Sequence, residues 1–186
     1  VISPIGNQVE DFWDGLVSGR NGIDTVTRFD VSQLSTRMGG EVKNFEAGKY
    51  MDGKEARRAD IFVQYAIGAS HQALESAGLL DGVPEPDRTG VLIGTGIGGI
   101  STFEAQHRLM LEKGPRRISP FFIPAAIVNL AAGWVSIRSG AKGPNSATAT
   151  ACTSGAHAVG DSFRLIQRGD AVAMIAGGAE AAITPL

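Results

Sequence analysis

The single cysteine of the chain lies in a sequence context that suits a catalytic nucleophile. Cys152 stands between a run of small and β-branched residues, "SATATA" (146–151), and a Gly- and Ala-rich segment with helical character. A sharp turn from a strand into a helix lifts a side chain clear of a sheet, and a helix N-terminus favours a thiolate. The alternative is a free cysteine that fills space in the core. The placement favours a nucleophile for covalent catalysis.

A glycine-rich segment, "GTGIGG" (94–99), follows an apolar strand and precedes a helix. Gly94, Gly96 and Gly99 match the dinucleotide-binding fingerprint, which also requires a second strand that ends in an acidic residue about 20 residues further on. The continuation, "EKGPRRISPFF" (112–122), contains no such strand. A nucleotide-binding module is therefore only weakly supported. We expect the glycines to let the backbone pass close to another segment or a ligand.

The histidines offer no clear base for Cys152. His157 follows on the same predicted helix, but five residues correspond to about 140° around the helix axis. His71 and His107 fall on amphipathic helices and are expected at the surface. No His or Cys spacing fits a metal site, so we expect no metal and no cofactor. Because acyl chemistry on a cysteine needs a base and oxyanion donors, the partner groups are expected beyond Leu186.

Basic residues form two clusters, one at the start of a predicted long helix and one in a Pro-rich segment. They are Lys54, Arg57 and Arg58, and Lys113, Arg116 and Arg117. Solvated surface charge would explain both clusters, but on a slightly acidic chain they could also steer an acidic partner. The formal net charge of −2 argues against a nucleic-acid partner.

The predicted elements alternate between helices and short apolar strands. The segments predicted as helix are 7–18, 54–77, 101–113, 124–138 and 153–168; those predicted as buried strand are 89–94, 146–151 and 171–178, with a strand end at 1–2 and an irregular excursion over 20–53. Continuous apolar strands between helices predict an α/β fold with a parallel sheet covered on both faces.

Composition is typical of one globular domain. The chain has 186 residues, of which 43% are hydrophobic and 19% charged, so it can build a core. A lone cysteine excludes an intrachain disulfide framework and suits a reducing compartment, so a cytoplasmic location is expected. The most apolar stretch (121–137) contains Pro124 and Asn129, and no membrane association is expected.

The segment "GPNSATATACTSGAHAVGDSFRLIQRGDAVAMIAGGAEAAITP" (143–185) resembles the active-site region of the β-ketoacyl-[acyl-carrier-protein] synthases, and within them the type II synthases of bacterial fatty acid synthesis. "VISPIG", "GTGIGG" and "GPRRISPFFIP" agree with that family in order and spacing. The resemblance implies a thiolase-like fold, with residues 1–186 as its N-terminal βαβα half. In that case the first strand is truncated, and the C-terminal half, with two catalytic histidines, a lysine and a second oxyanion donor, is absent.

The resemblance also implies roles for individual residues. Cys152 matches the nucleophile that accepts an acyl group from acyl carrier protein and is then attacked by decarboxylated malonyl-carrier protein. Ile97 matches a residue that lines the acyl pocket, and Phe122 one that reaches into the partner's pocket of a homodimer. Positions that match basic residues meeting the carrier protein are Lys54, Arg57, Arg58, Arg116 and Arg117.

Related enzymes remain as alternatives. A polyketide-synthase ketosynthase shares the fold and the cysteine, but usually has serines after it, where this chain has Thr153, Ser154 and Gly155. A thiolase would use related chemistry without decarboxylation, in a different active-site context. A non-catalytic chain-length partner normally lacks the cysteine, so Cys152 argues against that alternative.

Overall fold

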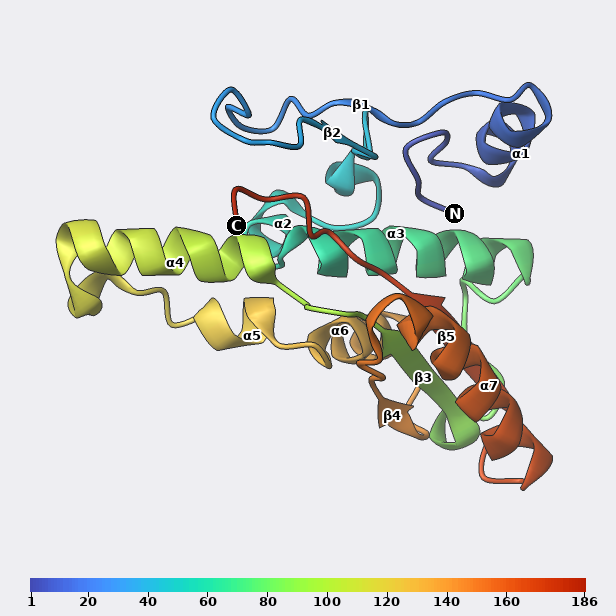
Figure 1. Ribbon diagram of the computed structural model, residues 1–186. Coiled ribbons are helices and arrows are strands. Elements are labelled where there is room, and N and C mark those ends of the chain that lie inside the picture. Colours follow the sequence, from blue (N-terminus) through green and yellow to red (C-terminus); the bar gives the residue numbers. More distant parts are fainter.

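A parallel β-sheet of three strands, packed beside α7, is the main sheet in a computed structural model that describes residues 1–186 (Figure 1). The strands are β3 (Thr89–Gly94), β4 (Asn145–Ser146) and β5 (Ala173–Gly178), in the order β4-β3-β5. Every residue of β3 is buried, as expected for the continuous apolar run of a central parallel strand. The α/β class and the parallel sheet predicted from the sequence are confirmed.

Helices cover the sheet. Helix α7 (Ser154–Gln167) packs against β3 and β5, while α6 (Leu130–Ser139) packs against β3 and α3 (Ile61–Ser76). The core lies between these helices and the sheet, and Phe62 and Val63 of α3 are fully buried there. The remaining elements are α1 (Val9–Val17), β1 (Asp24–Thr25), β2 (Met38–Gly39), α2 (Gly53–Ala56), α4 (Ile100–Lys113), α5 (Phe122–Ala126), and the short 3-10 helices η1 (Ala47–Lys49), η2 (Pro86–Arg88), η3 (Pro115–Arg117) and η4 (Ala151–Thr153).

Two helices predicted as continuous are broken in the structure. The segment 54–77 divides into α2 and α3, because Asp60 adopts an extended conformation and its carboxylate accepts a hydrogen bond from the Phe62 N–H. The segment 124–138 divides into α5 and α6, because Ile127 is extended (φ −72°, ψ 144°). The apolar periodicity was correct in both segments, but local caps and turns interrupt it.

The predicted strands differ from the structure at the edges of the sheet. Only Asn145 and Ser146 of the second strand pair with β3, and both are exposed, so the prediction of a buried strand over 146–151 is wrong. The strand predicted over 171–178 is β5, which is partly exposed because it is the other edge strand. Val1 and Ile2 form no strand; the Val1 ammonium donates to the Gln72 side-chain oxygen.

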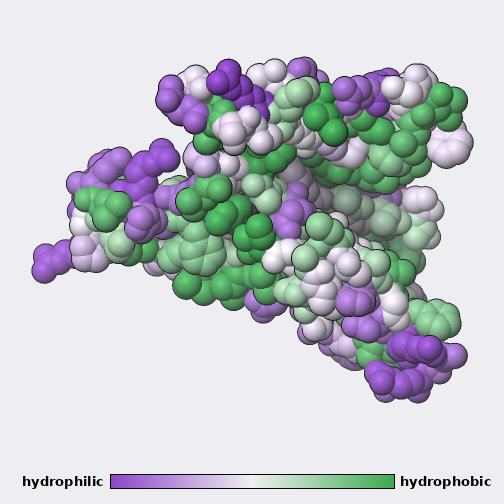
Figure 2. All heavy atoms as spheres, in the orientation of Figure 1, coloured by the Kyte–Doolittle hydropathy of each residue, from purple (hydrophilic) through white to green (hydrophobic).

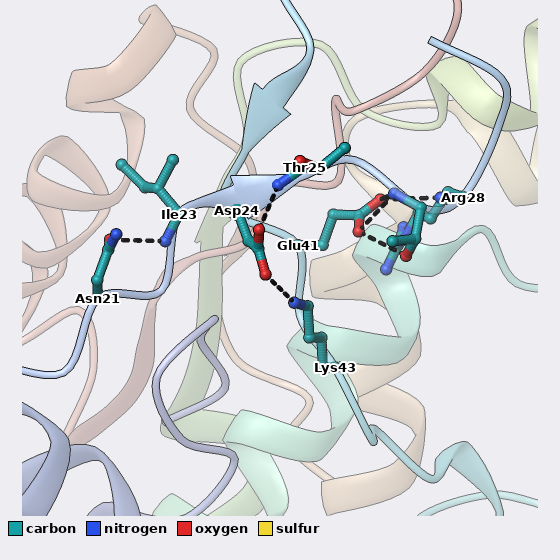
Figure 3. A network of polar contacts seen from close by, with 8 residues as sticks. Asn21, Ile23, Asp24, Thr25, Arg28, Glu41 and Lys43 are labelled. Atoms are coloured by element: carbon teal, nitrogen blue, oxygen red, sulfur yellow. Dashed lines mark hydrogen bonds and ion pairs between the residues drawn. The ribbon is translucent and has the colours of Figure 1, made fainter. Parts of the chain in front are cut away.

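The irregular excursion over 20–53 is held together by a buried carboxylate (Figure 3). Glu41, 3% exposed, accepts hydrogen bonds from the N–H and hydroxyl of Thr27 and from the N–H of Arg28. Burial alone would raise the pKa of Glu41, but these hydrogen bonds and the Arg28 charge together hold that pKa below its ordinary value. Beside it, β1 and β2 form a short antiparallel pair.

Candidate active site

Cys152 lies on a tight turn immediately before α7. The turn, residues 150–154, includes η4, and Ala151 adopts a left-handed conformation (φ 53°) that is unusual for a residue other than glycine. Ser154, 2% exposed, braces it: its hydroxyl accepts from the Thr150 N–H at 2.8 Å and donates to the Ala151 carbonyl at 2.6 Å. The sharp turn expected from the sequence is therefore present, although α7 begins at Ser154, two residues after the cysteine.

The thiol of Cys152 is unpaired and exposed. A cysteine used only to fill space in the core would be buried, so that alternative does not describe this residue. The Cys152 backbone N–H donates to no acceptor within the chain, and it lies next to the N-terminus of α7. An unpaired N–H beside a nucleophile can donate to the oxyanion that forms when the nucleophile attacks a carbonyl.

A cavity of about 680 Å³ opens beside the thiol, within the size range of small-molecule sites. Three segments line it: the 150–154 turn with Cys152, the segment after β5 with Glu180, and residues 94–99, which we call the glycine loop and which carry Ile97. Ile97 is 53% exposed. The structure thus brings Cys152 and Ile97 to one cavity, although the sequence separates them by more than fifty residues.

Glycines allow the cavity walls to approach one another closely. A Cβ at Gly94 would lie 2.3 Å from the Ser154 carbonyl oxygen, and one at Gly99 would lie 2.6 Å from the Ala126 Cα. Such distances are far inside van der Waals contact, so only glycine fits at either position. The expected close approach of the backbone at this segment is confirmed.

All five N–H groups from Thr95 to Gly99 have acceptors within the chain. Glu180 accepts from Gly96 and Ile97, and the Thr95 hydroxyl oxygen accepts from Gly98. The Thr95 N–H donates to Thr148, and the Gly99 N–H to Ala126. Nucleotide phosphates bind such loops through free N–H groups and would here meet a carboxylate, so the loop does not suit a nucleotide.

The remaining predicted site residues lie away from the Cys152 cavity. Phe122 packs edge to face on Phe103, with ring centroids 5.0 Å apart, and lines a separate cavity of about 280 Å³ with Arg57 and Arg58. The Arg58 guanidinium lies 4.0 Å from the ring centre of Phe121. Figure 2 shows hydrophobic residues gathered over α5 and the adjoining end of α4.

The two basic clusters lie on α2 with its following link, and on η3 at the end of α4. Lys54, Arg57, Arg116 and Arg117 are exposed, and Arg58 is half-buried. Because α3 begins only at Ile61, the first cluster precedes the long helix instead of starting it. The Arg58 contact with Phe121 places the first cluster beside the segment that connects η3 to α5.

No histidine contacts Cys152. His157 Nδ1 lies 2.6 Å from the Thr150 hydroxyl, His71 packs on Tyr50, and His107 lines a groove with Leu186. No group of three or more His, Cys, Asp or Glu side chains is arranged to hold a metal ion. None of the helices combines the length and apolar character needed to cross a membrane.

An exposed cysteine at a turn before a helix of an α/β fold is an arrangement that suits a cysteine nucleophile, and the family comparison identifies the class of protein. Residues 1–186 match the model of the beta-ketoacyl synthase N-terminal domain, and the chain belongs to this family. It is 55% identical over 185 residues to a 3-oxoacyl-[acyl-carrier-protein] synthase 2 of Synechocystis sp., covering 100% of this chain and 44% of the relative. Over 183 residues it is 52% identical to a synthase 2 of Staphylococcus aureus, covering 98% of this chain and 45% of the relative.

Solved structures agree on the fold. The ishigamide ketosynthase/chain length factor superposes with a TM-score of 0.88 at 26% identity, over 97% of this chain and 45% of that one. A ketosynthase in complex with its type II polyketide acyl-carrier protein gives a TM-score of 0.82 at 23% identity, over 98% and 49%. The chain therefore spans less than half the length of the relatives and structures that it matches.

Proposed function

We propose that residues 1–186 form the N-terminal half of a 3-oxoacyl-[acyl-carrier-protein] synthase that elongates fatty acids. The Cys152 thiolate attacks the carbonyl carbon of an acyl group on a carrier-protein thioester, and the carrier thiol leaves. Malonyl-carrier protein then loses carbon dioxide, and the electron pair left on its α-carbon attacks the Cys152 thioester. That step releases the Cys152 thiolate and leaves on the carrier a 3-oxoacyl chain two carbons longer.

The exposed thiol of Cys152, which lines an open cavity of about 680 Å³, carries this proposal. Its free N–H is oriented by the same turn and would donate one hydrogen bond to the oxyanion. Ile97 supplies apolar surface to the same cavity, which suits an acyl chain. Identities of 55% and 52% to curated 3-oxoacyl-[acyl-carrier-protein] synthases 2 support the fatty acid synthase assignment.

A base for the decarboxylation step would come from the other half of the whole protein. Glu180 is the only ionisable residue besides Cys152 that lines the cavity, and both of its oxygens already accept hydrogen bonds from the glycine loop. The family resemblance assigns the base to histidines in a C-terminal half. The residues of this chain would therefore hold and orient the acyl group, while the other half completes the reaction.

Acyl carrier protein is the proposed partner of the two basic clusters. Acidic carrier proteins would be attracted by exposed cations, and this attraction weakens as salt screens it. Reversing Arg57, Arg58, Arg116 and Arg117 to Glu should raise the KM for acyl-carrier protein and leave small thioester substrates unaffected. An equal loss with both substrate types would contradict the docking role. We also propose a cytoplasmic homodimer, in which Phe122 reaches the partner subunit.

Acylation of Cys152 tests the proposed function directly. The full-length protein is incubated with an acyl-carrier protein and then digested, and the masses of the peptides of the full-length protein are measured by mass spectrometry. We expect the acyl mass on the peptide that contains Cys152, none in the Cys152→Ser variant, and normal acylation in the His107→Ala control, whose side chain lines a different groove. Wild-type protein that never acquires the acyl mass would overturn the proposal.

A further inference from the structure

Glu180 holds the glycine loop through three hydrogen bonds. Its Oε2 accepts from the Gly96 N–H at 2.6 Å and from the Ile97 N–H at 3.2 Å, and its Oε1 accepts from the Thr95 hydroxyl at 3.2 Å. A Cβ at Gly96 would lie 2.8 Å from Oε2, so the absence of a side chain at that position makes room for the carboxylate. Hydrogen bonds to a charged acceptor are stronger than those between neutral groups.

The register of the sheet brings these residues together. β3 and β5 are parallel neighbours that end side by side at Gly94 and Gly178. The Ala179 N–H donates to the Gly94 carbonyl at 2.9 Å, which places the next residue, Glu180, beside the beginning of the glycine loop. Segments that follow parallel strands meet at one edge of a sheet, and functional sites are found there.

The same contacts continue to the nucleophile. Thr95 is 2% exposed, and its carbonyl oxygen lies 3.3 Å from the Ser154 hydroxyl, which braces the turn of Cys152. One connected set of side chains therefore joins Glu180 to the loop that carries Ile97 and to the turn that carries Cys152. Loss of the carboxylate would release the N–H groups of Ile97 and of the preceding residue, Gly96.

We propose that Glu180 is a positioning residue that fixes Ile97 relative to the Cys152 thiol and so sets the length of chain that the cavity accepts. As a statement about acyl chains, this inference rests on the proposed function. Both Glu180 oxygens accept hydrogen bonds from the loop, so the carboxylate holds the backbone there. The three contacts identify the glycine loop as what Glu180 binds.

The test uses the full-length protein and the variant Glu180→Gln, which keeps the size of the side chain but replaces a charged oxygen by an amide NH2 group. Glu46→Gln is the matched control, because Glu46 is an exposed carboxylate paired only with Lys49. We expect exchange of the Gly96 and Ile97 amides to accelerate by about 10- to 100-fold in Glu180→Gln, which corresponds to loss of a charge-assisted hydrogen bond. The Glu46→Gln control should leave both amides unchanged.

Selectivity for chain length separates positioning from general support of the fold. We expect Glu180→Gln to change the ratio of kcat/KM between long and short acyl substrates by at least about tenfold, with a melting temperature close to that of wild type. Alkylation of Cys152 by N-alkylmaleimides of increasing chain length provides the same ratio without any acyl transfer. An unaltered ratio in both series would overturn the proposal.

Failure of the proposed function gives a different pattern. A wild-type protein that is not acylated but whose maleimide selectivity depends on Glu180 would refute the synthase assignment and retain the positioning role. If Glu180→Gln does not fold, Glu180→Asp, with its shorter side chain, replaces it in the same assays. In wild-type protein alone, unprotected Gly96 and Ile97 amides would also overturn the proposal.

Discussion

Replacing Ser154 by alanine should loosen the turn that presents Cys152. The Ser154 hydroxyl is buried, accepts from the Thr150 N–H and faces the Ala151 and Thr95 carbonyls as a donor, so Ser154→Ala leaves one donor and two acceptors without this partner. An unsatisfied polar group costs about 1–3 kcal/mol when water cannot reach it. Thr150 and Ala151 are exposed, so water replaces part of the loss and we expect about 1–2 kcal/mol.

A matched control lies on the same helix. Ser162 is as buried as Ser154 (3% against 2% exposed), but its hydroxyl has no hydrogen-bond partner. Ser162→Ala removes the same atom without breaking a bond, and it should be neutral or slightly stabilising. The difference between the two variants therefore isolates the hydrogen bonds of Ser154 from the effect of losing a buried oxygen.

Three measurements on the full-length protein check this prediction. The free energy of unfolding in urea should fall in Ser154→Ala relative to Ser162→Ala. A loss of about 1–2 kcal/mol confined to the turn should accelerate exchange of the Thr150 amide roughly 5- to 30-fold. Alkylation of Cys152 by iodoacetamide, expected to exceed that of a free thiol in wild type, should slow. Equal behaviour of the two alanine variants in all three assays would refute the bracing role of Ser154.

Further predictions concern the carboxylate of the excursion and the cavity walls. The pKa of Glu41 is held below the ordinary value of 4.5 in the folded state, so the Glu41 charge stabilises the protein above that pH. This stabilisation disappears as the pH falls through the lowered pKa, so the melting temperature of wild type should lose its advantage over that of Glu41→Gln between pH 7 and pH 3. A difference in melting temperature that stays constant over this range would contradict the prediction. Ile97→Phe should exclude longer acyl chains while short primers still acylate Cys152, and an unchanged chain-length profile would remove Ile97 from the pocket. Gly94→Ala should destabilise the protein by about 1–3 kcal/mol and slow alkylation of Cys152, because the new Cβ meets the Ser154 carbonyl. A Gly94→Ala variant as stable and as reactive as wild type would show that the strand can shift without cost.

Local sequence signals predicted the elements whose structure depends on neighbours in the chain. The strand over 89–94 was predicted with its observed bounds, since a continuous apolar run between glycines is buried wherever it pairs. The helix after Cys152 was predicted to within one residue at either end. The break at Asp60 was missed because apolar spacing continues across it, although an Asp before an apolar run is itself a helix-start signal.

Prediction failed where the answer depends on pairing between distant segments. The Thr- and Ala-rich run before Cys152 has the composition of a buried strand, but only its first residue, Ser146, pairs in the sheet, and most of the run is exposed. Cys152 could be identified because its signal is local. Glu180 could not, because its role depends on the register of β3 with β5, and its contacts cross more than eighty residues of sequence. The available clue was an acidic residue shortly after a strand end.

Asp60 gives the glycine loop a second fixed point. Its buried carboxylate accepts from the Phe62 N–H at the start of α3, and also from the N–H and hydroxyl of Thr102 at the start of α4, where the loop ends. With Glu180 at one end and Asp60 just beyond the other, the backbone on either side of Ile97 has little freedom to swing. Changes in cavity shape at this wall would then come from rotation of the Ile97 side chain, which takes picoseconds to nanoseconds for an exposed residue, and not from the slower opening of a loop.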